Sequence, residues 1–269
     1  MALFMSKVTE KLHRIWLLSK LLFKDLLRRR LSLLMLFILP ALFDIIILVT
    51  TNKNEVPVIL GILSDDSVRM LSRQARSFVF LGGAVVAFIT SFLAFYLVHQ
   101  RTEVDRRLVL CGYRPFDIIA AKMAVLIVIV ISIAVYEGLI IRPFIEPIHF
   151  GYVLAGLFLC GLVYSCYGLL VGAVSTHELE GIFLIVLVAN IDVGWLQNPS
   201  YYKESSNRLI IEYLPGFFPT QLAMVGTFTD GLPVVAIWGS LLYSAIFLAA
   251  AVFAFWLRIR GRTMSIIRR

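Results

Sequence analysis

The sequence predicts an all-α membrane protein with six transmembrane helices, an N-terminal amphipathic helix at the membrane interface, and short re-entrant helices before the last span. Hydrophobic residues make up 60% of the 269 residues, whereas soluble domains contain about 45–50%. The apolar residues gather in long runs, and the basic residues cluster beside those runs. Both features are typical of integral membrane proteins.

The first element is expected over residues 7–30, where basic and apolar positions alternate at helical spacing. Lys20, Lys24 and Arg28 fall four residues apart on one face, and Leu22 and Leu26 lie on the opposite face. This pattern predicts an amphipathic helix in the interface of a negatively charged leaflet. The alternative is a plain basic segment that only fixes the orientation of the chain.

Six apolar runs of near-spanning length follow, since a span needs about 20 mostly apolar residues. They cover about 31–50, 77–98, 119–141, 151–174, 181–196 and 232–256. We expect each run to be helical, because an unpaired backbone is too costly in hydrocarbon. Small residues in the fourth run predict close helix packing. They are Gly151, Ala155, Gly161, Ser165, Gly168 and Gly172.

The basic residues also predict the orientation of the chain. Of the 25 Lys and Arg residues, 8 lie in 1–30, 4 in 99–118 and 5 in 257–269. These segments fall on the same side when the spans alternate, and an excess of Lys and Arg marks the cytoplasmic side. We therefore expect an inner-membrane protein of the bacterial type with both termini in the cytoplasm.

The two longest outer segments differ in character. Residues 51–76 are polar and are expected to form a small lid of strand and helix. Residues 197–231 are apolar in their second half, but prolines and glycines such as Pro215 and Gly216 interrupt them. This predicts one or two short re-entrant helices whose broken backbone is buried against other helices. The alternative is a helical cap that rests on the outer surface.

The sequence contains no catalytic constellation. It has no GxxxxGK[ST] phosphate loop, no HExxH or GxSxG motif, and no Cys/His pattern at metal-binding spacing. The three cysteines, Cys111, Cys160 and Cys166, do not make a disulfide framework. Outside the spans there is no basic stripe with stacking aromatics, which argues against a nucleic-acid partner. We expect no enzyme activity, metal or cofactor on this chain.

Three acidic residues fall inside apolar runs, towards the expected outer side: Asp44, Glu137 and Asp192. Ionisable residues inside spans are costly and therefore indicate function. They could line a polar cavity, and the alternative is that they are hydrated at the membrane interface. Asp44 and Asp192, with Phe217 and Phe218 of the outer segment, are the candidate residues of a substrate pathway.

A charged break, HQRTEVDRRLVLCGYRPFDIIAAK, separates the second and third spans at residues 99–122. Its arginines and acids form a short charged surface that could bind a soluble partner through charge-assisted contacts. They are Glu103, Asp105, Arg106, Arg107 and Arg114. The alternative is a solvated loop whose arginines only fix the topology.

The stretches EVDRRLVLCGYRPFDIIAAKM and YLPGFFPTQLAMVGTFTDG, in this order of helices, resemble the type-2 family of ATP-binding-cassette export permeases. The resemblance implies that 99–118 is a cytoplasmic coupling segment, and that Lys122 matches a lysine that follows it in the family. It places Glu103, Asp105, Arg106, Arg107, Leu108 and Leu110 in the coupling helix, followed by Gly112 (a proline in the family), Tyr113 and Arg114.

The family further implies the function: the membrane subunit of an exporter for a hydrophobic, lipid-like or drug-like substrate. Two separate ATPase subunits would bind ATP and Mg, and a second copy or a homologous permease would complete the pathway between the first, second and fifth spans. One alternative is a secondary transporter driven by an ion gradient, which calls for internal repeats and a deep ionisable group. The other is a membrane-embedded lipid-modifying enzyme, which calls for clustered acids, His or Ser at the membrane surface.

Overall fold

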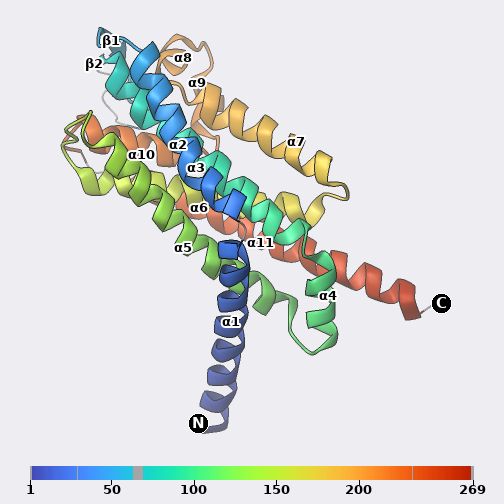
Figure 1. Ribbon diagram of the computed structural model, residues 1–269. Helices are drawn as coiled ribbons and strands as arrows, with labels where there is room; N and C mark the ends of the chain where they lie inside the picture. The colour runs from blue at the N-terminus through green and yellow to red at the C-terminus, as the bar shows by residue number, and fades with distance from the viewer. Residues whose placement is uncertain (1, 29, 63–68, 232, 268–269) are drawn as a thin grey trace.

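The computed structural model describes residues 2–28, 30–62, 69–231 and 233–267. It is a helical bundle with a small hairpin at one end (Figure 1). The long helices are α1 (Ala2–Arg28), α2 (Arg30–Thr50), α3 (Arg73–His99), α5 (Pro115–Ile141), α6 (Phe150–Val174) and α11 (Val234–Ile267). The shorter elements are β1 (Glu55–Val58), β2 (Arg69–Ser72), α4 (Thr102–Leu110), α7 (Glu178–Ala189) with its π-helical continuation η1 (Asn190–Leu196), α8 (Pro199–Glu204), α9 (Arg208–Glu212) and α10 (Phe217–Phe228).

Among the described residues, five helices are long and apolar enough to cross a membrane: α3, α5, α6, α7 with η1, and the Val234–Arg258 part of α11. The all-α membrane character predicted from the sequence is therefore confirmed. The expected first span is α2, which is helical around Pro40, but its apolar stretch Leu36–Thr50 is shorter. The count of six spans stays a prediction.

Helices α3 and α6 form the centre of the bundle, and most of each is buried. A Cβ at Gly168 would collide with the Ser91 carbonyl of α3, and one at Gly172 would stand 3.0 Å from the Phe95 carbonyl. The close packing expected of these small residues is thus confirmed at both positions. The prediction of close packing is wrong for Gly151, where a Cβ would meet nothing within 4 Å.

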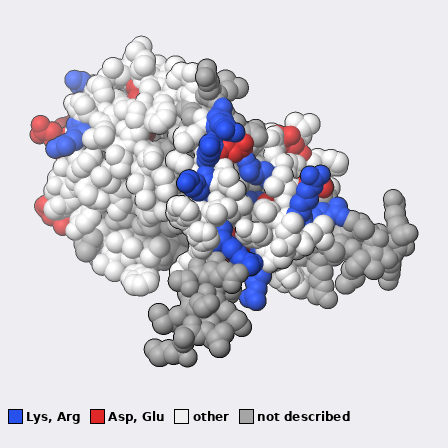
Figure 2. All heavy atoms as spheres, turned by 60° about the horizontal axis from the view of Figure 1, so that its bottom comes forward, with Lys and Arg blue, Asp and Glu red and all other residues white. Residues whose placement is uncertain are grey.

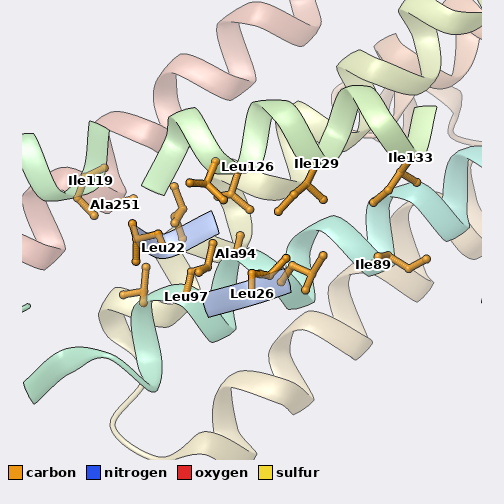
Figure 3. Packing of buried hydrophobic residues seen from close by; sticks show 14 of the residues in the cluster. Leu22, Leu26, Ile89, Ala94, Leu97, Ile119, Leu126, Ile129, Ile133 and Ala251 are labelled. Atoms are coloured by element: carbon orange, nitrogen blue, oxygen red, sulfur yellow. The ribbon is translucent and has the colours of Figure 1, made fainter. Parts of the chain in front are cut away.

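The largest hydrophobic cluster joins α1, α2, α3, α5, α6 and α11 (Figure 3). Helix α1 enters it through Leu18, Leu22 and Leu26, which recur every four residues and are all buried. Burying one such side chain stabilises a fold by about 1.5–3 kcal/mol. The second half of α1 is therefore a packed part of the bundle, and its position at the membrane interface stays a prediction.

The far end of the bundle carries the hairpin and the short helices. Strands β1 and β2 pair antiparallel, with Glu55 opposite Ser72, so the strand expected in 51–76 is present. Helix α10 is buried on nearly every side, and a Cβ at Gly156 of α6 would collide with the backbone of Ala223. The interrupted segment thus packs against other helices, as expected. Its re-entry into the membrane stays a prediction.

Candidate functional site

The charged break predicted at 99–118 folds into helix α4 and a turn at the end of the molecule opposite the hairpin (Figure 1). Figure 2, which brings this end forward, shows Lys and Arg gathered there. Acidic residues lie in the first turn of α4 and Arg107 lies in the last, a distribution that favours the helix dipole. The charges of α4 therefore stabilise this short helix.

The exposed side of this segment, the docking surface, combines basic and large apolar side chains. Its exposed residues are Glu103, Val104, Arg107, Leu110, Cys111, Gly112, Arg114 and Phe116. Leu110 is 71% exposed and Phe116 is 64% exposed. Arg106 is less exposed and faces Glu103 at 4.0 Å. Apolar side chains with arginines around them are typical of a protein interface.

The turn after α4 depends on Gly112, whose φ of 90° is the only positive φ among the described residues. The N–H of Tyr113 donates to the Leu108 carbonyl and the N–H of Gly112 donates to the Val109 carbonyl, both at 3.0 Å. This is the Schellman arrangement, in which a glycine in the left-handed region ends a helix. It explains why proline, whose φ is fixed near −65°, does not stand at this position.

The buried side of α4 is joined to α5 by an ion pair between Asp105 and Lys122. Both side chains are buried, and the Lys122 ammonium also lies 5.3 Å from the ring centre of Phe255 in α11. Burial raises the pKa of the Asp105 carboxyl, and the ammonium of Lys122 opposes the rise. Asp105, which the sequence analysis placed with the docking residues, therefore faces inward and holds α4 to the bundle.

Further contacts surround this buried pair. Arg101, at the start of α4, forms an ion pair with Asp25 of α1. Arg14 of α1 lies 5.8 Å from the ring centre of Tyr113, and Arg258 of α11 donates to the Gly172 carbonyl at 2.7 Å. The segment is thus fixed to both α1 and α5 by ion pairs.

A lateral groove of about 420 Å³ opens between α2, α3 and the α7–η1 helix. Nine of its ten lining residues are apolar or glycine, and Asn190 is the polar one. The lining consists of Leu39, Phe43, Leu81, Ala84, Val85, Phe88, Val186, Ala189, Asn190 and Gly194. Its walls are the helices expected to be the first, second and fifth spans, and an apolar wall of this kind suits a hydrophobic molecule.

Asp192, a candidate pathway residue, is buried in η1, and its carboxylate accepts three hydrogen bonds. Its carboxylate accepts from the Tyr164 hydroxyl at 2.5 Å, the Gly216 N–H at 2.9 Å and the Gln197 amide at 3.0 Å. A carboxylate with three donors is stable in a buried place. Here it ties the fifth expected span to α6 and to the start of α10.

Phe217 and Phe218 follow directly after Gly216, so the structure brings them close to Asp192. Their rings meet edge to face at 5.5 Å, and Phe217 packs on Tyr202 at 6.0 Å. Phe218 continues the aromatic row to Tyr243 of α11 at 5.9 Å. This row lies outside the lining of the lateral groove.

Asp44 lies elsewhere, between α2 and α5, close enough to Glu137 to interact with it electrostatically. The Asp44 side chain is 4% exposed and Glu137 1%. Both Asp44 oxygens and Oε2 of Glu137 have no hydrogen-bond partner among the described residues. Asp44 also borders a cavity of about 300 Å³ that Tyr136 and Phe144 help to line. Two buried acids with unsatisfied carboxyl oxygens are costly and so indicate a function.

Sequence reasoning singled out the charged segment 99–122 and the acidic residues. The resemblance implied a pathway between the first, second and fifth spans, but no residue pattern indicated which side chains line the groove. The groove residues carry no signal of their own, because leucine, alanine and valine occur throughout the spans. The pairing of Asp105 with Lys122 was also missed, although both residues had been singled out. Within the described ranges, no group of three or more His, Cys, Asp or Glu side chains could hold a metal ion.

Comparison of the chain with protein-family models and with curated proteins finds no match. Its function is therefore inferred from the residues and geometry described above.

Proposed function

We propose that the chain is the permease subunit of an ATP-binding-cassette exporter, with six spans, both termini in the cytoplasm of a bacterial cell, and 197–231 re-entrant from the outer side. The observation that carries the proposal is the structure of segment 99–122, which has an exposed outer side and an ion-paired inner side. This segment presents an exposed surface of arginines and large apolar side chains. On its buried side, the ion pair between Asp105 and Lys122 joins it to α5. A solvated loop that only fixed topology would need no such buried ion pair.

The chain has no phosphate loop of its own, so the energy would come from two separate ATPase subunits that bind ATP and Mg. These subunits would dock on the surface around Arg107 and Leu110. Their closure on ATP would push α4, and the contacts of Arg101 and Asp105 would carry the movement into α1 and α5. Coupling of this kind requires an element with two arrangements that the partner biases.

The substrate would be hydrophobic, lipid-like or drug-like, and would move through the lateral groove between α2, α3 and α7. Exposed apolar side chains flank the groove on both sides, among them Leu42 on α2 and Phe183 on α7. A second copy of the chain, or a homologous permease, would pack against these faces and close the pathway. Binding to an apolar groove is favoured by the area removed from water or lipid.

Reversal of charge on the docking surface tests the proposal. Arg107→Glu combined with Leu110→Glu should abolish co-purification of the ATPase subunits and the transport that depends on them, while the chain still inserts and melts normally. Lys53→Glu, an exposed charge reversal at the other end, is the matched control and should leave both unchanged. Intact assembly and transport in the double variant would refute the docking assignment.

A secondary transporter driven by an ion gradient is the second candidate, and the buried Asp44 and Glu137, with their unsatisfied oxygens, favour it. These acids could bind and release a proton or cation during transport. Transport in sealed vesicles separates the two candidates. Transport by an exporter requires ATP and continues when the ion gradients are collapsed. Transport by a gradient-driven carrier stops when the gradients are collapsed, and it also stops in the Asp44→Asn and Glu137→Gln variants.

A further inference from the structure

A second cleft, of about 420 Å³, lies at the hairpin end of the molecule, where α2 ends and α3 begins. Its lining is almost wholly polar, in contrast to the lateral groove. The lining residues are Thr50, Thr51, Asn52, Arg73, Arg76, Ser77 and Ser200. They include two arginines and no acid.

The two arginines lie one helical turn apart on α3, so their charges repel each other. Arg76 is only 7% exposed, and its guanidinium donates to the Ser200 hydroxyl at 2.5 Å. Neither Arg73 nor Arg76 forms an ion pair with another residue that the structure describes. A buried cation without a counter-charge is unfavourable, and an anion in the cleft would compensate it.

The cleft also supplies neutral donors suited to an oxyanion. Ser200 accepts its bond from Arg76 and keeps its own hydroxyl proton to donate, and the Asn52 side chain carries a further N–H donor. The N-terminus of α3 adds a positive dipole at the same place. Guanidinium groups bind phosphate through pairs of parallel N–H bonds.

We infer that this cleft binds a phosphate group, and that the group belongs to the headgroup of a membrane lipid. The cleft lies where α2 ends and α3 begins. On the proposed topology both are spans, and the ends of spans lie at the depth of lipid headgroups. Val49, next to Thr50, is 78% exposed on the apolar face of α2, so an acyl chain has a surface to lie along. The inference concerns the end opposite the docking surface and does not depend on an ATPase partner.

Calorimetric titration of the purified full chain in neutral maltoside micelles tests the site. The probe is dihexanoyl phosphatidic acid, with dihexanoylglycerol as its neutral counterpart. Binding should be saturable for the phosphatidic acid and absent for the neutral lipid. Loss of one guanidinium should weaken binding by about tenfold or more. Arg73→Gln makes this change at an exposed position, and Arg76→Gln makes it at the buried one.

The matched control is Arg69→Gln, which removes an exposed arginine of β2 that lies outside the cleft. It should bind phosphatidic acid as the unaltered chain does. Inorganic phosphate, titrated alone, separates the sources: clearly weaker binding supports a lipid headgroup, and equal affinity overturns that part of the inference in favour of free phosphate. Equal loss of affinity in Arg69→Gln, or full affinity in folded Arg73→Gln, overturns the site itself.

Discussion

At the scale of single residues, Gly112 decides the shape of the docking surface. Its positive φ lets the chain turn back after Leu110, and the two bonds of the Schellman motif close the helix end. A residue with a Cβ is strained in this region of φ and ψ. Gly112 stands where the permease family that the sequence resembles usually has a proline, and its positive φ is one that proline cannot adopt.

Replacement of Gly112 should therefore destabilise the segment in a graded way. Gly112→Ala should lower the free energy of unfolding by about 1 kcal/mol, and Gly112→Pro should cost more because proline cannot reach a positive φ. Thermal unfolding in micelles and partner co-purification measure the effect. Gly151→Ala in helix α6, where a Cβ meets open space and φ is not positive, should be neutral or slightly stabilising. A neutral Gly112→Pro would contradict the turn.

The Asp105–Lys122 pair predicts a characteristic non-additivity. Loss of one partner leaves a buried charge uncompensated, so Asp105→Asn and Lys122→Met should each cost about 3–5 kcal/mol. The double variant should cost clearly less than the sum, because no buried charge remains. Unfolding of the four proteins under one condition gives the coupling. Additive effects would show that the two side chains do not interact.

These two residues also show what the sequence could tell at this scale. Asp105 and Lys122 were both recognisable as charged residues in a segment next to a span. Their pairing was not, because they are 17 residues apart and meet only through the turn at Gly112. Asp105 was therefore placed on the surface, where its neighbours Glu103 and Arg107 do lie.

At the scale of elements, hydropathy located the helices well and their ends less well. Helix α3 begins at Arg73 and α5 at Pro115, each four residues before the apolar run that predicted it. The first turn of a helix tolerates charge and favours proline, so apolar composition does not mark it. The π-helical turn of η1 has no recognisable sequence signal either, and it places Asp192 where three donors converge.

Asp192 is predicted to hold η1 and α10 together. Asp192→Ala would leave the Tyr164 hydroxyl and the Gly216 N–H buried without an acceptor, at about 1–3 kcal/mol for each group. Thermal stability should fall, and limited proteolysis near Leu214 should become faster. Asp230→Asn, at a position that is 90% exposed, should change neither. Unchanged protease resistance in Asp192→Ala would show that the contacts are dispensable.

The lateral groove gives a prediction about transport. Ala84→Phe places a large ring from α3 into the groove, so transport of a hydrophobic substrate should fall severalfold while the ATPase subunits still co-purify. Ala245→Phe makes the same change on α11 at an exposed position outside the groove. It should transport normally. Full transport by Ala84→Phe would place the substrate path elsewhere.

At the scale of the whole molecule, the two ends of the bundle have different chemistry. One end carries α4, the chain termini and most of the gathered basic residues, and the other carries the hairpin, α8 and α9 (Figures 1 and 2). This polarity was readable from the distribution of Lys and Arg. The lining of the groove was not, because it depends on how α2 and α3 pack against the distant α7–η1 helix.

The central claim is that an ATPase subunit docks on the α4 surface. Cys111 offers a direct test, because it is exposed while Cys160 and Cys166 are buried. A benzophenone maleimide attached to Cys111 of the chain in its native membrane should, on illumination, cross-link a soluble protein that carries a phosphate loop, identified by mass spectrometry. The Arg107→Glu, Leu110→Glu variant should lose the cross-link. Efficient labelling that captures no phosphate-loop protein would contradict the account.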